Sequence, residues 1–329
     1  MASPRVDPLS SARISLDALP LRLEITPRMT DPDSKISRID ASGLGVATLC
    51  CLFWGGNAVA AKITVSSTNM PPIGSAGFRF LLSLPVVAWV GYKVGASARV
   101  AVRHWWLVAA HGVLAAIQIG GFNWGTSLSE AGRSSVFINI HPLVVAPLAW
   151  LLLGEKLGTR GILGLISAAL GVAILLAKPI LSGGGGGLTG DLIVLGAGVV
   201  FGLQTIAQKK TFPIIPPTTL LLLQSAVAVP ITFGFSYWFE GPATYHFTPS
   251  ALGGLFYQGF VVSGLTFSLW MILLRRYLAG QLAAVSFMTP LFGIALGTLI
   301  RGEPITLTLV VGSAAVGLGI YLAASDRGD

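Results

Sequence analysis

Ten apolar runs, separated by short polar breaks, follow one another along the chain from Ala41 to Ala323. Each run is about 20 residues long, which is the length an α-helix needs to cross roughly 30 Å of hydrocarbon. Runs of this length satisfy every backbone group inside a bilayer as helices rather than as barrel strands. The pattern therefore predicts an all-α polytopic membrane protein with transmembrane helices at 42–63, 72–92, 105–125, 133–153, 159–177, 190–208, 217–238, 250–271, 281–300 and 304–323.

Charged residues are too few to cover a soluble fold of this length. They make up 10% of the 329 residues, against about 25% in soluble domains. The only cysteines, Cys50 and Cys51, are adjacent, which excludes a disulfide scaffold and leaves no ligand set for a metal or other cofactor. The expected partners are a small-molecule substrate and the lipid bilayer, with no nucleic acid, and a homodimer is left open.

The first 40 residues carry charges of both signs and no continuous apolar stretch, so we expect a disordered tail rather than a signal peptide. Met29 offers an alternative translation start. If the tail is cytoplasmic, 16 Lys and Arg lie on the cytoplasmic side and four on the outer side. This asymmetry predicts a multi-pass protein of a bacterial inner membrane with both termini, residues 324–329 included, in the cytoplasm.

The chain also repeats itself, at an offset of 145 to 148 residues maintained across five helices. The repeats are predicted at 41–177 and 190–323, joined by a glycine-rich linker at 178–189. Because each copy holds an odd number of helices, the second copy must be inverted in the membrane, which is the architecture of alternating-access transport. The matched pairs include Asn57 with Gln204, Lys62 with Lys209, and Pro142 with Pro290.

Several short motifs recur in a fixed order along these helices. They are Phe53-Trp54-Gly55-Gly56-Asn57, Pro71-Pro72 with Arg79-Phe80, His141-Pro142, and Gly154-Glu155 with its echo Gly302-Glu303. This ordered set resembles the drug/metabolite transporter superfamily, in particular its EamA-type members, which have ten helices in two five-helix repeats. The resemblance covers about 41–323. It implies a permease, often an exporter of amino acids or related metabolites, with helices 1, 3, 4, 6, 8 and 9 around a central cavity.

Polar side chains inside the spans are the candidates for lining that cavity, because they are expensive to place in a bilayer. His111 and Gln118 are seven residues apart and share one face of the third helix. Packing between helices is the alternative interpretation for each candidate. The predicted cavity residues are Asn57, His111, Gln118, Gln204, Tyr257, Gln258, Ser268 and Trp270.

Arg79 is the only fully ionised side chain well inside a predicted span. It could pair with a substrate carboxylate or phosphate, or it could be a structural arginine that reaches the interface or binds backbone carbonyls. Prolines that lie within the spans in matched pairs bend helices and suit hinges. These are Pro85, Pro142, Pro230 and Pro290.

No Asp or Glu lies deep in a predicted span, which disfavours a dedicated cation exporter. Proton coupling would have to use His111 or His141, and a facilitator without coupling is the simpler hypothesis. We therefore expect a permease, not an enzyme, that exports a small neutral, zwitterionic or anionic metabolite such as an amino acid. The alternatives are a nucleotide-sugar or sugar-phosphate exchanger of the same superfamily and, more remotely, a membrane-embedded enzyme with catalytic residues that the sequence does not reveal.

Overall fold

The structure is a computed structural model that describes residues 39–66, 70–96, 99–153, 158–181, 187–242, 245–277, 282, 285–286 and 288–325. The predictions made for residues 1–38, including the Met29 start, lie outside this part of the chain. The same holds for Gly154-Glu155, for the glycines of the linker up to residue 186, and for residues 326–329.

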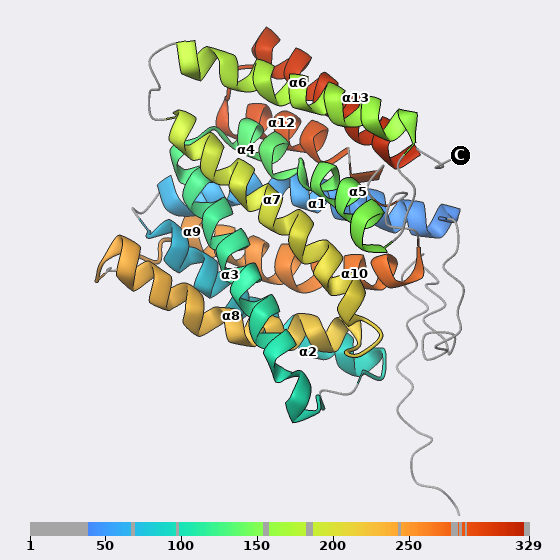
Figure 1. Cartoon of the computed structure of the whole chain (residues 1–329). Coiled ribbons are helices and arrows are strands. Elements are labelled where there is room, and N and C mark those ends of the chain that lie inside the picture. Colours follow the sequence, from blue (N-terminus) through green and yellow to red (C-terminus); the bar gives the residue numbers. More distant parts are fainter. Residues whose placement is uncertain are drawn as a thin grey trace, which may run out of the picture. The chain divides into compact units, whose positions relative to one another are not determined.

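The described residues form a bundle of helices (Figure 1). In chain order these are α1 (Ala41–Ser66), α2 (Pro72–Lys93), η2 (Val102–His104), α3 (Trp105–Leu128), α4 (Ala131–Ile138), α5 (His141–Leu153), α6 (Thr159–Leu181), α7 (Gly187–Thr211), α8 (Pro217–Glu240), α9 (Pro249–Phe256), η3 (Tyr257–Thr266), α10 (Phe267–Arg276), α12 (Met288–Arg301) and α13 (Leu307–Ser325).

Seven continuous helical segments are long and apolar enough to cross a membrane, and three shorter apolar helices complete the ten predicted spans. Over the described residues the shorter ones are Thr159–Leu175, Met288–Arg301 and Leu307–Gly319. The prediction of an all-α fold with ten transmembrane helices is confirmed.

Two of the predicted spans are not single regular helices. The fourth span is divided into α4 and α5 by a turn at Asn139 and Ile140. Pro142 accounts for this break, because proline has no N–H for the carbonyl four residues earlier and its ring clashes with that carbonyl. The eighth span contains a π-helical segment, η3, between α9 and α10, in which the Thr266 hydroxyl donates to the carbonyl of Val261. Segments of this kind are rare and often occur at functional sites.

The helix ends define two faces of the bundle, which we call the near face and the far face. At the near face α1 begins and α10 ends, and the Tyr277 hydroxyl donates to Asp40 Oδ1 at 2.9 Å. Asp40 caps α1, because the same oxygen accepts the Gly43 N–H at 2.7 Å. This hydrogen bond lowers the pKa of Asp40 below its ordinary value. At the far face α1 and α3 end, while α4 and α7 begin.

The contact between α6 and α13 shows that the repeats are inverted. A Cβ placed on Gly171 would lie 2.7 Å from the carbonyl oxygen of Gly312, and one placed on Gly319 would lie 2.5 Å from that of Gly164. The two contacts are the same contact exchanged between repeats. Residue numbers rise along α6 as they fall along α13, so these equivalent helices run antiparallel, side by side (Figure 1).

This close approach predicts that Gly171→Ala destabilises the protein. The added methyl group would overlap the backbone of α13, and overpacking of this kind typically costs about 1–3 kcal/mol. Gly196→Ala on α7 is the matched control, because nothing lies within 4 Å of a Cβ at Gly196. Thermal melting in detergent should show a lower Tm for the first variant only. Equal melting temperatures would contradict the α6–α13 packing.

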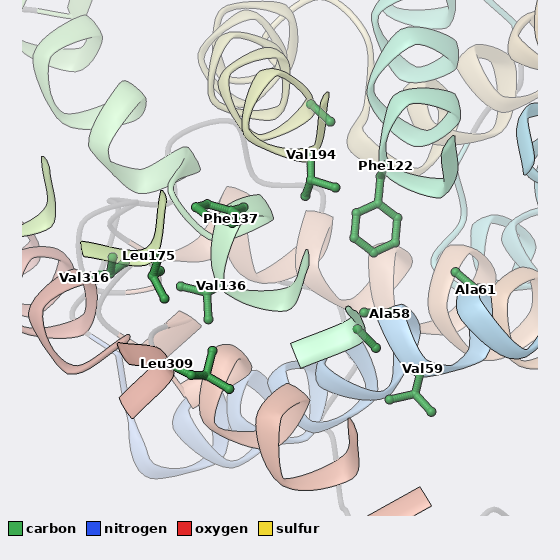
Figure 2. Close-up of a cluster of buried hydrophobic side chains, with 12 residues drawn as sticks. Ala58, Val59, Ala61, Phe122, Val136, Phe137, Leu175, Val194, Leu309 and Val316 are labelled. Carbon is green, nitrogen blue, oxygen red and sulfur yellow. The ribbon is translucent and has the colours of Figure 1, made fainter. Parts of the chain in front are cut away.

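A buried apolar cluster ties the two repeats together in the far half of the bundle (Figure 2). Its side chains come from α1, α3, α4, α6, α7 and α13. Buried side chains of this kind pack as densely as molecules in an organic crystal, which leaves little room for water. The cluster therefore forms an apolar plug between the middle of the bundle and the far face. Its buried members are Ala58, Val59, Ala61, Phe122, Ala131, Val136, Phe137, Leu175, Val194, Ala197, Leu309 and Val316.

Candidate substrate cavity

A cavity of about 40 Å³ lies in the middle of the bundle, where helices from both repeats meet. This volume holds only a few water molecules, so a metabolite can enter only if the surrounding helices move apart. The lining residues come from spans 1, 2, 3, 4, 6, 8 and 9. They are Trp54, Asn57, Ala58, Arg79, Gln118, Phe122, Ser135, Ile138, Asn139, Phe201, Phe267 and Thr289.

Arg79 brings a positive charge into this cavity. Its side chain is 2% exposed. Its Nε donates to Ser263 Oγ, in the π-helical segment, and its Nη1 donates to Asn57 Oδ1 at 3.3 Å. Within the described part of the chain, no carboxylate lies within ion-pair distance of the guanidinium, since the ion pairs there involve other arginines. The charge of Arg79 is thus held by neutral partners at the cavity wall.

The start of α2 determines how deep Arg79 lies. The helix begins with Pro72, whose fixed φ suits a first helical position. The Glu240 carboxylate at the end of α8 accepts the N–H groups of Ile73 and Gly74 at 2.8 and 3.0 Å. Arg79 is seven residues beyond Pro72, which places it roughly 10 Å from the helix start at 1.5 Å per residue.

Two buried polar groups at the cavity wall have no hydrogen-bond partner among the described residues. They are the indole Nε1 of Trp54 and the Oγ1 of Thr289. Buried polar groups are normally satisfied, by water or a ligand if not by protein. The Trp54 indole is therefore a donor without a partner at the cavity wall, whereas the Thr289 hydroxyl lies beside the Cys51 thiol.

Asn139 and Ser135 complete the polar wall next to the break between α4 and α5. Asn139 Nδ2 donates to the carbonyl of Ser135 at 2.7 Å. The side-chain amide thereby satisfies a carbonyl in the last turn of α4. Neither residue, nor Thr289, was a candidate from the sequence. The available signal was the proline pair, because Asn139 comes three residues before Pro142 and Thr289 directly before Pro290.

Another part of the cavity wall is aromatic. The Trp54 ring lies 6.4 Å from Phe201 and 5.4 Å from Phe267, and those two phenylalanines are 6.2 Å apart. Trp270 packs against Trp54 at 4.6 Å but does not line the cavity. The contacts of Trp54 with the two phenylalanines are edge-to-face, and such contacts are worth about 0.5–1.5 kcal/mol beyond area burial. This wall is therefore apolar except for the indole N–H of Trp54.

Three of the sequence candidates line the cavity, namely Asn57, Gln118 and Arg79. His111, the helical neighbour of Gln118, does not. Seven residues along a helix share a face but differ by about 10 Å in depth, and only Gln118 lies level with the cavity. The contribution of these residues to transport stays a prediction.

The remaining cavity candidates make contacts elsewhere. Tyr257 donates to the carbonyl of Phe53 at 2.8 Å, and Ser268 to the carbonyl of Gly264 on its own helix at 2.6 Å. Gln204 is buried but is absent from the cavity lining. The contacts of Tyr257 and Ser268 match the packing interpretation, and a role of all three residues in transport stays a prediction.

The predicted hinge prolines differ in their position within a helix. Pro85 and Pro230 lie inside α2 and α8, where proline bends a helix. Pro142 lies in the first turn of α5, where proline is tolerated without a bend. Pro142 therefore marks a helix start. Pro290 lies in α12, and the described residues 285–286 before that helix are helical as well. Movement at any of the four prolines stays a prediction.

His111 and Gln258 make the same contact in the two repeats, 147 residues apart. Gln258 Nε2 donates to Thr64 Oγ1 at 3.0 Å in the far half, and His111 Nε2 lies 3.0 Å from Thr211 Oγ1 in the near half. Thr211 already donates its hydroxyl hydrogen to the carbonyl of Ala207. Since a hydroxyl has one hydrogen, His111 must be the donor to Thr211.

This equivalence predicts that His111→Gln is tolerated, because glutamine makes the same contact at position 258. His111→Ala should lower the melting temperature, since it removes the donor to Thr211 and loses roughly 0.6 kcal/mol, the average for a hydrogen bond between membrane helices. Expression and thermal melting of the two variants check the difference. Equal losses in both would show that the imidazole, rather than its hydrogen bond, is needed.

Polar contacts seal the far face beyond the apolar plug. The Lys62 ammonium donates to the carbonyls of Thr126 and Ser127 at 3.3 and 3.1 Å and to that of Ser129, at the end of α3. The carbonyl of Thr126 also accepts the N–H of Ser129 at 3.4 Å. A cation beside the last carbonyls of a helix complements the helix dipole. Lys62 therefore ties the end of α1 to the end of α3.

A buried ion pair adds a second connection at the far face. Asp191, near the start of α7, pairs with Arg133 of α4 and accepts the hydroxyl of Ser129. Glu303, which follows α12, caps α4 by accepting the N–H groups of Ala131 and Gly132 at 2.9 Å each. These contacts join both repeats, so the structure is closed towards the far face.

Comparison with known proteins agrees with this architecture. The sequence profile of the EamA-like transporter family matches residues 41–177 and again residues 188–325. A solved crystal structure has the same fold, with a TM-score of 0.66 over 87% of this chain and 98% of that chain, at 17% sequence identity.

Two curated relatives are similar over most of their length. A transporter of Bacillus subtilis, YoaV, described as uncharacterized, is 23% identical over 85% of this chain and 95% of its own length. A probable amino-acid metabolite efflux pump of Salmonella typhimurium is 26% identical over 84% of this chain and 93% of its own length. With the profile matching both halves of its helical bundle, the chain belongs to the EamA-like transporter family of multi-pass membrane proteins.

Proposed function

We propose that the protein is a permease that exports a small zwitterionic or anionic metabolite of the amino-acid type by alternating access. The observation that carries the proposal is the cavity, which lies between inverted repeats and presents the charge of Arg79, for which the described residues supply no carboxylate partner. A site at the interface of inverted repeats is reached from one side or the other as the repeats rock. The relative described as an amino-acid metabolite efflux pump supports the substrate class and the direction.

The composition of the cavity favours this substrate class over a sugar nucleotide. A diphosphate would need several basic groups, and Arg79 alone supplies a charge among the described lining residues. It also favours transport over catalysis, since no His, Asp, Glu, Cys or Lys is among those lining residues and general acid–base chemistry requires such groups. The exchanger and enzyme alternatives have no comparable support.

Transport in proteoliposomes tests the proposal. Purified protein would be reconstituted with a panel of unlabelled amino acids inside, and the uptake of labelled amino acids by counterflow would be measured. We expect counterflow for at least one carboxylate-bearing compound and none in vesicles without protein. If no amino acid or related carboxylate exchanges, while the protein is folded by melting analysis, the proposed function is wrong.

The orientation in the membrane gives a separate prediction. Lys and Arg cluster at the near face, for example Arg275 and Arg276 at the end of α10, and this bias marks the cytoplasmic side. Reporters fused after Asp329 or after residue 95 should therefore be cytoplasmic, and one fused after Gly241 external. A periplasmic signal at Asp329 would contradict both the charge bias and the even number of spans.

A further inference from the structure

Among the described residues that line the cavity there is one positive charge, that of Arg79, and no negative charge. Arg79 is buried, lines the cavity, and donates only to the neutral side chains of Ser263 and Asn57. All acidic residues that the structure describes lie at helix ends, outside the cavity lining. They are Asp40, Glu130, Asp191, Glu240 and Glu303.

The acidic groups nearest the helix interiors are already engaged at the far face. Asp191 is 0% exposed and pairs with Arg133, and Glu303 accepts two backbone N–H groups of α4. Neither is available to Arg79. A buried charge without a counter-ion is costly, and a ligand that supplies one negative charge removes this cost.

The neutral polar groups of the wall are suited to the rest of an anion. Trp54 Nε1 is a donor without a partner among the described residues, and the Thr289 hydroxyl, beside the Cys51 thiol, can donate or accept. An ammonium group would find no carboxylate among the described lining residues, only amide and hydroxyl oxygens and the faces of the aromatic rings. One of those oxygens, Asn57 Oδ1, already accepts from Arg79. The ammonium would also be buried within the field of the guanidinium, where like charges repel.

On the basis of the proposed function, we propose that the substrate is a small monoanionic carboxylate rather than a zwitterion, with Arg79 as the carboxylate receptor. The hydroxyl or amide part of the substrate faces the polar wall, and its apolar part faces the aromatic wall formed by Trp54, Phe201 and Phe267. The substrate brings the counter-charge that the described residues around Arg79 do not supply. Net charge, rather than the presence of a carboxylate alone, then decides which compounds are carried.

Three compounds of one shape and three charges test this assignment. They are 2-hydroxy-4-methylpentanoate, an anion; L-leucine, which has an ammonium in place of that hydroxyl; and L-leucinamide, a cation. Uptake of each labelled compound would be measured with the full chain in proteoliposomes at pH 7. Potassium and valinomycin on both sides would hold the membrane potential at zero, so that net charge does not itself bias the flux.

We expect the hydroxy acid to enter at least about tenfold faster than leucine, and leucinamide not to enter above protein-free vesicles. Leucine uptake equal to or faster than that of the hydroxy acid would overturn the monoanion assignment and leave the proposed permease intact. Uptake of none of these compounds, nor of any compound in the wider panel, would end both proposals.

Variants of Arg79 give a readout that a merely structural role would not produce. Arg79→Lys keeps the charge and should keep the preference for the anion, at a reduced rate. Arg79→Gln removes the charge, and the ratio of anion to zwitterion uptake should fall to about one. An unchanged ratio in folded Arg79→Gln would show that Arg79 does not read the charge of the substrate.

Discussion

Arg79→Gln is expected to slow transport of the anionic carboxylate strongly, to about the rate of the matching zwitterion, while the protein stays folded. Glutamine retains a donor for Ser263 or Asn57 but loses the charge that faces the cavity. Truncating one partner of a buried charge pair costs about 2–5 kcal/mol, which corresponds to roughly 30- to 4000-fold weaker binding. Counterflow rates and binding isotherms, each with the melting temperature of the same preparation, measure the effect.

The control is Arg79→Lys, which keeps the charge but loses the planar donor set that contacts two side chains at once. Its binding should fall between those of the wild type and Arg79→Gln. Wild-type transport by Arg79→Gln would show that Arg79 serves only to pack α2 against the π-helical segment.

Asp191→Asn is expected to cause the largest loss of stability of any substitution considered. Asp191 is fully buried, and its removal leaves the Arg133 guanidinium without a counter-ion between α4 and α7. Breaking a buried ion pair from one side costs about 3–5 kcal/mol. Because the Arg133 side chain is 19% exposed and retains some hydration, we expect a value near the lower end, about 3 kcal/mol.

The double variant Arg133→Met with Asp191→Asn is the matched control, because it removes both charges and preserves most of the volume. Replacing a buried pair on both sides is often nearly neutral, so the double variant should recover much of the lost stability. Denaturant unfolding of the single and double variants measures the coupling. Additive losses would mean that the two side chains do not stabilise each other.

Substitutions at the far-face contacts should also affect how stably that face is closed. Lys62, Asp191 and Glu303 each tie helix ends of one repeat together or join the two repeats. Weakening these contacts destabilises the conformation closed at the far face more than one that is open there. Such a differential effect shifts the equilibrium between the two conformations toward the open one.

The candidate site could be predicted only in part from the sequence. Asn57, Gln118 and Arg79 were found because polar side chains stand out within apolar runs. Phe201 and Phe267 could not be found this way, because an aromatic residue in a transmembrane helix looks the same whether it faces lipid, a neighbouring helix or a cavity. The π-helical segment, which places Ser263 beside Arg79, has no pattern that the sequence reveals.

The number of spans, their duplication and the inversion of the second half follow from the sequence alone. Each is a local or a counting property: run length sets a span, constant offset shows a repeat, and an odd helix count inverts it. Which side of each helix faces the cavity depends instead on packing between the repeats. In a bilayer the lipid-facing and buried sides of a helix are both apolar, so the contrast that identifies the inner face of a soluble helix is missing. His111 and Gln118 illustrate this, because they share one face of the same helix. At the depth of Gln118 that face borders the cavity, whereas at the depth of His111 it contacts Thr211 of α7.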